Sequence, residues 1–209
     1  MGLFMILTFL LAGCGESSKL YPASKADGVY FSVPKDWNGL STEALNTYEK
    51  QSAGDKSGSR QALVKWQVAY SPIPKIKVSE VFSLKPPKSP LIFARIRNLT
   101  TPEINDFSYN SLRNVIVPVT DLAAGKNAGA PDFKVLLDEE VVQKGGRGVH
   151  SIFSFSIDGV AQTFNQTVLT SNDRATLLIF IARCESTCYV KNQKQIEEIV
   201  KSYTVRGAK

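Results

Sequence analysis

The stretch "SIFSFSIDGVAQTFNQTVLTSNDRATLLIFIA", residues 151–182, carries the clearest structural signal in this sequence. Phe153 and Phe155 alternate with serines, which is the pattern of a strand with one buried face. Asp158-Gly159 has the chemistry of a tight hairpin turn, because both positions tolerate positive φ. The following residues, up to Thr170, return as the partner strand. This stretch therefore predicts consecutive antiparallel strands.

The end of the same stretch, Thr176–Ala182, is apolar without interruption. A strand of this kind is covered on both faces, so we place it in the middle of the sheet. Another strand precedes the quoted stretch, because apolar residues alternate from Phe133 to Val141, and Gly145–Gly148 turns the chain after it. The sheet is then a meander of neighbouring strands.

The C-terminal segment predicts one amphipathic helix. Its apolar residues recur at helical intervals: Tyr189, Ile196, Ile199, Val200 and Tyr203. The apolar side of such a helix must cover a face of the sheet. The predicted fold class is therefore α+β, an antiparallel β-sheet covered by helices.

Weaker patterns describe the rest of the chain. A strand ends at Pro34, and Ser41 caps a helix that runs to about Gln51. Thr101-Pro102-Glu103 opens a second helix, with Thr101 as its N-cap and an apolar side that extends to Val115. Residues 53–60 have loop composition. Strands around residues 64–68 and 91–96 border a proline-interrupted excursion, and residues 61–99 have no further readable pattern.

The amino terminus has the pattern of an export signal. Residues 3–11 are almost entirely apolar but too few to span a bilayer as a helix. Leu11-Ala12-Gly13-Cys14 resembles the lipobox of bacterial lipoproteins, although no Lys or Arg precedes Cys14. The resemblance implies a signal peptide over residues 1–13, cleaved before Cys14, and acyl chains such as palmitate on Cys14. We then expect an extracytoplasmic protein, lipid-anchored to a bacterial cell membrane, with residues 14–27 as a flexible tether.

The remaining cysteines, Cys184 and Cys188, form an even pair once Cys14 carries lipid. In an oxidising compartment they can close into a disulfide with a small loop, which is the main prediction. The alternatives are a redox pair or a metal site. The spacing is not Cys-x-x-Cys, and His150, the only histidine, would be the sole additional zinc-type ligand.

Composition predicts one globular domain, which we place at residues 28–206. The chain of 209 residues is 43% hydrophobic and 21% charged, as folded proteins are. Its formal charge of +6 would attract an anionic membrane surface modestly. The basic residues are scattered rather than clustered, so we do not expect a nucleic-acid partner.

Catalytic patterns are weak. His150 shares the polar side of its strand with Ser154 and Ser156, and no G-x-S-x-G elbow accompanies it, so we expect a solvent-facing histidine. The run Asp138-Glu139-Glu140 alternates between two faces of a strand, which a solvated sheet edge explains better than paired catalysis. No dinucleotide or metal-ligand spacing occurs, so the sequence predicts neither an enzyme nor a cofactor.

The order of elements resembles the PsbP-like superfamily, which includes cyanobacterial PsbP lipoproteins, DcrB envelope proteins and LpqN-type lipoproteins. The matching pieces are Phe31-Ser-Val-Pro34-Lys-Asp-Trp37, the consecutive late strands and the closing "QIEEIVKSYTV", residues 195–205. The resemblance implies a non-enzymatic α/β/α sandwich that binds other proteins or assists their assembly. It implies no ligand-binding residues.

Together these patterns predict a membrane-anchored binding or assembly-accessory module of the cell envelope. The partner is an envelope protein or an apolar ligand. Two alternatives stay open: a carrier of lipid or another apolar ligand, and an envelope hydrolase. A carrier requires a deep apolar cavity of several hundred cubic ångströms, whereas a hydrolase requires convergent polar groups around His150 or the acidic run.

Overall fold

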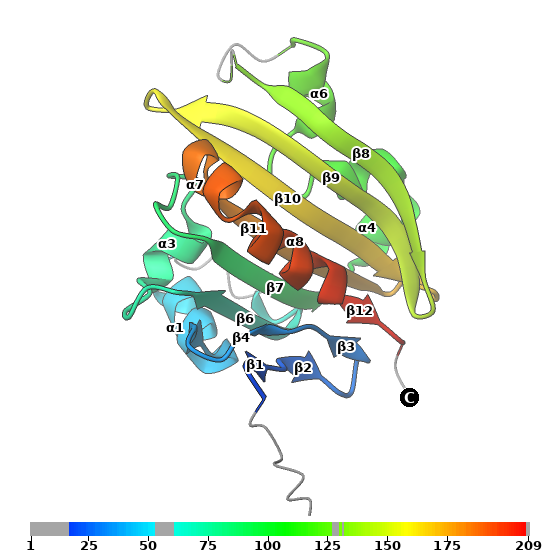
Figure 1. Ribbon diagram of the computed structural model, residues 1–209. Helices are drawn as coiled ribbons and strands as arrows, with labels where there is room; N and C mark the ends of the chain where they lie inside the picture. The colour runs from blue at the N-terminus through cyan, green and yellow to red at the C-terminus, as the bar shows by residue number, and fades with distance from the viewer. Residues whose placement is uncertain (1–16, 53–60, 127–129, 131, 208–209) are drawn as a thin grey trace, which may run out of the picture.

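A seven-stranded antiparallel sheet forms the centre of the molecule (Figure 1). The computed structural model describes residues 17–52, 61–126, 130 and 132–207, so the predicted loop at 53–60 lies outside the described residues. The strand order is β5-β6-β7-β11-β10-β9-β8. The strands are β5 (Asn38–Leu40), β6 (Val64–Ser71), β7 (Leu91–Asn98), β8 (Lys134–Gln143), β9 (Gly146–Ile157), β10 (Val160–Ser171) and β11 (Thr176–Glu185).

The late strands confirm the predicted meander. β9 and β10 pair through a turn in which Asp158 and Gly159 have φ angles of 51° and 77°. β11 lies between β10 and β7 and is buried on both faces, as its continuous apolar run predicted. The turn before β9 is shorter than predicted, because Gly146 and Gly148 already belong to that strand.

Helices cover both faces of the sheet, which makes an α/β/α sandwich with two cores. One face packs against α7 (Ser186–Lys191), α8 (Gln193–Ser202) and the N-terminal strands, around Phe180. The other face packs against the remaining helices, around Phe153. Those helices are α1 (Thr42–Ser52), α3 (Val78–Phe82), α5 (Tyr109–Arg113) and α6 (Val119–Ala123), whereas α4 (Thr101–Asn105) lies on the same side but buries no side chain. In Figure 1, α8 crosses the front of the sheet and α4 and α6 lie behind it.

The predicted tether at 14–27 is wrong for residues 19–27, which belong to the folded body. β1 (Lys19–Leu20) pairs with β4 (Val33–Pro34). β2 (Ala23–Ser24) joins a small sheet with β3 (Val29–Tyr30) and the last strand, β12 (Thr204–Val205). The composition of the segment is that of a loop, but long-range backbone pairing orders it. The body therefore begins before the predicted boundary at residue 28.

Two predicted helices are divided. The helix predicted from Thr101 to Val115 is α4 followed by α5, because Ser108 starts a new helix in which its side chain and that of Ser111 cap each other's backbone N–H. The N-cap of α4 is Thr100, one residue before the predicted cap. The C-terminal helix is divided into α7 and α8 at Asn192. The α1 helix follows Ser41 as predicted, and the Ser41 hydroxyl accepts from Ala44 N–H at 3.3 Å.

Candidate functional sites

Cys14, the predicted lipidation site, lies outside the described residues. The described chain begins at Ser17, and β1 begins two residues later at Lys19. Among the helices of the described ranges, none has the length and apolarity needed to cross a bilayer.

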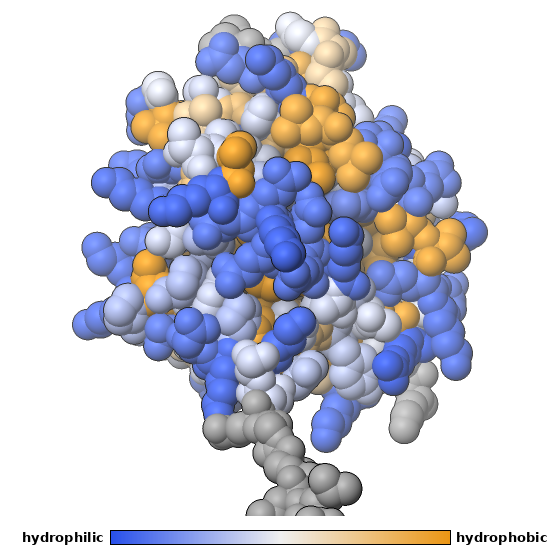
Figure 2. Space-filling view, viewed as in Figure 1, coloured by the Kyte–Doolittle hydropathy of each residue, from blue (hydrophilic) through white to orange (hydrophobic). Residues whose placement is uncertain are grey.

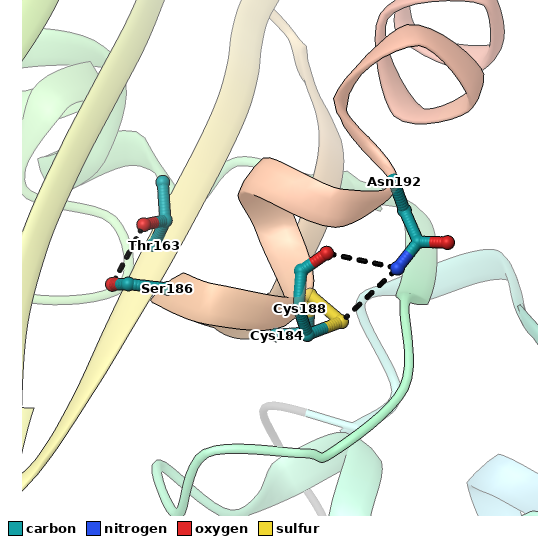
Figure 3. The surroundings of a disulfide bond; sticks show 5 residues. All are labelled: Thr163, Cys184, Ser186, Cys188 and Asn192. Atoms are coloured by element: carbon teal, nitrogen blue, oxygen red, sulfur yellow. Dashed lines mark hydrogen bonds between the residues drawn. A yellow bond between two sulfur atoms is a disulfide. The ribbon is translucent and has the colours of Figure 1, made fainter.

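A disulfide joins Cys184, at the end of β11, to Cys188 in α7, and their Cα atoms are 6.0 Å apart (Figure 3). Asn192 turns back toward the bridge, and its Nδ2 donates to the Cys188 carbonyl at 2.8 Å. On the other side of α7, the hydroxyls of Ser186 and Thr163 lie 2.9 Å apart. The disulfide and the Ser186–Thr163 contact fasten α7 to the centre of the sheet, and the Asn192 side chain caps the end of this helix.

Burial of the two sulfurs bears on the redox alternative. Cys184 is fully buried and Cys188 is 9% exposed. A catalytic or regulatory disulfide must be reachable by an attacking thiolate, so this geometry favours a structural bridge. His150 is not placed as a metal partner for them. Within the described part of the chain, no group of three or more His, Cys, Asp or Glu side chains could hold a metal ion.

His150 lies in a chain of hydrogen bonds that runs from Glu139 to Tyr189. Its Nδ1 is 3.0 Å from a carboxylate oxygen of Glu139, and its Nε2 is 2.9 Å from the amide oxygen of Asn165. Asn165 in turn donates to the Tyr189 hydroxyl at 2.9 Å. A general base needs a ring nitrogen directed at the proton of a nucleophile, and both nitrogens here have other partners. This arrangement positions side chains and does not resemble a hydrolytic triad.

The prediction that His150 faces solvent is wrong. Its side chain is only 17% exposed. Glu139 on the neighbouring strand contacts one ring nitrogen. Asn165 contacts the other ring nitrogen, and Asn165 is in turn hydrogen-bonded to Tyr189 of α7. Residue alternation placed His150 on the polar side of β9 but could not show that this side is covered.

The acidic run of β8 is divided between the two faces, as alternation predicted. Asp138 accepts a hydrogen bond at 2.9 Å from Nε of Arg113, a residue of α5. Glu139 contacts His150 on the opposite face of the sheet. Their different partners leave no paired carboxylates for acid–base catalysis. The run lies on the outermost strand, which confirms the predicted sheet edge.

A buried arginine, which no sequence pattern marked, holds part of residues 61–99, the region in which the sequence showed little pattern. Arg183 on β11 is 4% exposed, and its guanidinium donates to the backbone carbonyls of Glu80 at 2.6 Å, Ser83 at 2.5 Å and Lys85 at 3.1 Å. Burial lowers the pKa of Arg183 to about 10, and the charge of Glu80 acts against that shift, so the group stays protonated at neutral pH. Gln162 assists by donating to the Leu84 carbonyl at 2.7 Å.

These contacts hold α3 and the proline-rich segment after it against the sheet. Both were missed because the partners of Arg183 are about 100 residues away in the chain and are backbone atoms. No side-chain pattern marks such partners. The cluster shapes the fold, and its donors are already engaged with the protein itself.

Two surface cavities have about the volume that a small ligand needs, and the walls of both mix polar and apolar residues. The first, of about 330 Å³, lies among the β10–β11 turn, the C-terminal segment and the residues before β3. Its wall includes the ion pair of Lys65 with Asp27, and the Ser24 hydroxyl donates to the same Asp27 at 2.6 Å. A hydrogen bond from Ser171 holds the pKa of the nearby Asp173 carboxyl below its usual value, and backbone N–H of Ala175 adds to this.

The second cavity, of about 390 Å³, lies between β5, β6 and the start of α1. Trp66 and Tyr70 give it an apolar side, whereas Ser41, Thr42 and Glu43 give it a polar one. The aromatic residues Trp37 and Phe180 are buried in the core and line neither cavity. Neither cavity is the deep apolar chamber that a lipid carrier requires.

The edge strand β8 exposes several apolar side chains. It pairs with β9 on one side, and no strand of the described residues pairs with its other side. Its side chains include Val135, Leu136 and Val142, which are 43%, 59% and 80% exposed. Figure 2 shows hydrophobic surface at two places over this strand, with hydrophilic surface between them.

Comparison with known proteins identifies the fold. No protein-family model and no curated protein sequence matches this chain. Among solved structures, it is similar to the cyanobacterial PsbP (CyanoP) of Synechocystis sp. PCC 6803, with a TM-score of 0.52 and 12% identity over 93% of this chain and 96% of that chain. It is less similar to LpqN, which is involved in cell envelope biogenesis of Mycobacterium tuberculosis, with a TM-score of 0.46, 13% identity and 90% of each chain covered.

At such low identity, a likeness between structures shows the fold alone. The chain has a PsbP-like α+β fold, which confirms the predicted fold class and the structural part of the resemblance. The structural match to CyanoP covers 93% of this chain, which agrees with a folded body that includes β1 and β2.

Proposed function

We propose that this chain is a lipid-anchored, extracytoplasmic accessory protein that binds another component of the cell envelope and catalyses no reaction. The observation that carries the proposal is the lipobox-like Leu11-Ala12-Gly13-Cys14, placed directly before a PsbP-like body. In this proposal Cys14 bears the acyl chains, residues 1–13 are removed, and the folded body does the binding.

The position of β1 makes the proposed anchor short. Residues 15–18 are the only ones between Cys14 and β1. Even fully extended, four residues reach about 14 Å. The body would therefore stay close to the bilayer, where its partner must also lie.

Two observations weigh against the alternative functions. Both ring nitrogens of His150 are engaged by Glu139 and Asn165, which argues against a hydrolase built on that residue. The walls of the two cavities carry charged and hydroxyl groups, which argues against a carrier of apolar ligands.

Subcellular fractionation of a Cys14→Ser variant tests the anchor. We expect the parent chain to sediment with membranes after a high-salt wash and to incorporate labelled palmitate, because two or three acyl chains bind a bilayer stably. The variant should lose the label and leave the membrane fraction. As a matched control, Cys184→Ser with Cys188→Ser keeps Cys14 and should remain in the pellet.

The proposal fails if the parent carries no lipid, or if Cys14→Ser sediments as completely as the parent. Enzymatic activity of the purified chain on envelope polymers that is abolished by His150→Ala would contradict the non-catalytic part of the proposal.

A further inference from the structure

We infer that β8 is a docking edge for an extended, basic segment of a partner protein, which adds as an eighth strand to the sheet. This inference deepens the proposed function and rests on it, because it assigns the surface and the chemistry of the partner to the binding role. The argument uses the backbone, the exposed side chains and the charges of β8.

The backbone of β8 offers a template for a new strand. On an outermost strand, alternate backbone N–H and C=O groups point away from the sheet, and an extended peptide can pair with them. The pairing of β8 with β9 is irregular between Val135 and Leu137 but continuous from Leu137 to Gln143. The segment Leu137–Gln143 is thus an edge with regular pairing.

Proteins usually protect such edges, and the opposite edge of this sheet shows how. There the outermost strand, β5, has only three residues. β8 has ten, contains no proline, and carries its single lysine at its first position. Short length, proline and central lysine are common means of preventing pairing with other chains, and β8 has none of them. Its protection consists of the irregularity between Val135 and Leu137 and of the acids Asp138, Glu139 and Glu140, whose charges a basic strand would neutralise.

The side chains of β8 define the partner. Exposed apolar residues occupy both ends of the strand, and Asp138, Glu139 and Glu140 occupy its centre. Arg113 and His150 contact the first two acids, whereas within the described residues no ion pair reaches Glu140. A complementary strand has Lys or Arg at its centre and β-branched or aromatic residues toward its ends.

The same charges argue against a second copy of this chain as the occupant. Antiparallel pairing of two β8 strands about Glu139 would place acidic residues opposite acidic residues, and like charges opposite each other destabilise a sheet. A basic segment removes this repulsion. The edge therefore selects a different protein with a basic strand.

Peptide selection tests the inference. The full chain, solubilised in detergent, is immobilised and exposed to a display library of random peptides of about ten residues, the length of a strand that pairs along all of β8. We expect the enriched sequences to have Lys or Arg at the centre and Val, Ile, Thr or aromatic residues around it. The absence of enrichment, or enrichment of acidic or proline-rich sequences, would overturn the inference.

Charge variants then locate the binding site. For the most enriched peptide, measured by fluorescence anisotropy, Glu140→Lys should weaken binding about three- to tenfold, the range for an exposed ion pair and its reversal. Glu198→Lys, the same change at an exposed position on α8, is the matched control and should leave the affinity unchanged. Equal effects of the two variants would contradict docking on β8.

An apolar pair of variants repeats the test without changing charge. Val142→Ser on β8 should weaken binding about threefold, as expected for the loss of one cross-strand contact. Val190→Ser changes a similarly exposed valine on α7, with 71% exposure against 80%, and should have no effect. A larger effect of Val190→Ser would place the site on the helical face.

Backbone methylation distinguishes strand addition from other binding modes. Methylating alternate amide nitrogens of the peptide removes one of its two rows of donors. We expect one methylated set to abolish binding and the other to preserve it, because only one row faces β8. On binding, hydrogen exchange should slow in β8 and stay unchanged in β5. Equal tolerance of both sets overturns the inference.

The two proposals fail separately. The selection uses purified protein and does not depend on the fractionation result, so loss of the lipid anchor would leave the docking edge standing. Conversely, failure of the peptide to bind would leave the membrane anchor intact.

Discussion

β8 and β11 are strands of equal length in one sheet, and their environments are opposite. Each has ten residues. β11 lies between two strands and between two helical layers, and its eight central residues are buried. β8 pairs on one side, and most of its side chains are exposed. The comparison separates two tasks: β11 stabilises the fold, and β8 carries the recognition role that we propose.

The largest expected effect is the loss of a buried ring from β11. Phe180 is fully buried, with Tyr203 stacked on it at 4.5 Å and Phe31 against its edge at 5.1 Å. Phe180→Ala should lower the free energy of unfolding by about 4 kcal/mol, since it removes apolar contacts and leaves a cavity. Leu136→Ala on β8 should change it by less than about 0.5 kcal/mol. Denaturant unfolding measures both, and similar losses would contradict the comparison.

Arg183→Met should have the next largest effect. It leaves the carbonyls of Glu80, Ser83 and Lys85 without their charged donor, so we expect a loss of about 3 kcal/mol. Hydrogen exchange should accelerate first in α3 and the residues after it. The control, Arg147→Met, changes an exposed arginine on β9 and should be nearly neutral. A stable variant with unchanged exchange would show that Arg183 does not hold this segment.

The disulfide at the end of β11 should contribute less. Its loop is short, so the entropy that it removes from the unfolded chain corresponds to about 2 kcal/mol. Cys184→Ala with Cys188→Ala should lose about this much in denaturant unfolding, and reductant should destabilise the parent but not the double variant. Mass spectrometry without reductant should find the two residues linked. Two free thiols in the exported protein would contradict the prediction.

The smallest effect concerns an exposed ion pair at the end of β7. Hydrogen bonds from Arg97, the largest cause, lower the pKa of Glu103 to about 2. A carboxyl whose pKa falls on folding adds stability above its unfolded pKa of about 4.5, and that stability is lost as pH falls toward 2.

Glu103→Gln should therefore be less stable than the parent at neutral pH. Because the side chain is 39% exposed, solvent screening limits the difference to about 1 kcal/mol or less. The difference should shrink as the pH is lowered from 4.5. Urea unfolding of the parent and the variant at several pH values measures it. A difference that grows in acid would reverse the assigned sign.

Local patterns were sufficient for the late strands and for the acidic edge. The continuous apolar run of β11 predicted its central position, and Asp138-Glu139-Glu140 predicted a sheet edge, since burial on two faces and exposure at an edge select different residues. The Asp158-Gly159 turn was also predicted, because positive φ restricts residue choice. The candidate docking site was only partly readable, since no pattern showed that, among the described residues, β8 has a strand on one side only.

Features that depend on distant parts of the chain were not readable. Residues 19–27 have the composition of a tether, but they pair with β3 and β4. His150 lies on the polar side of β9, but partners from β8 and β10 cover it. The antiparallel strands could be predicted from the alternation of apolar and polar side chains, because that alternation involves only neighbouring residues. The place of β5, β6 and β7 in the sheet and the backbone contacts of Arg183 depend on residues far apart in sequence. Only the tertiary structure decided them, because such contacts leave no periodic pattern in the sequence of either partner.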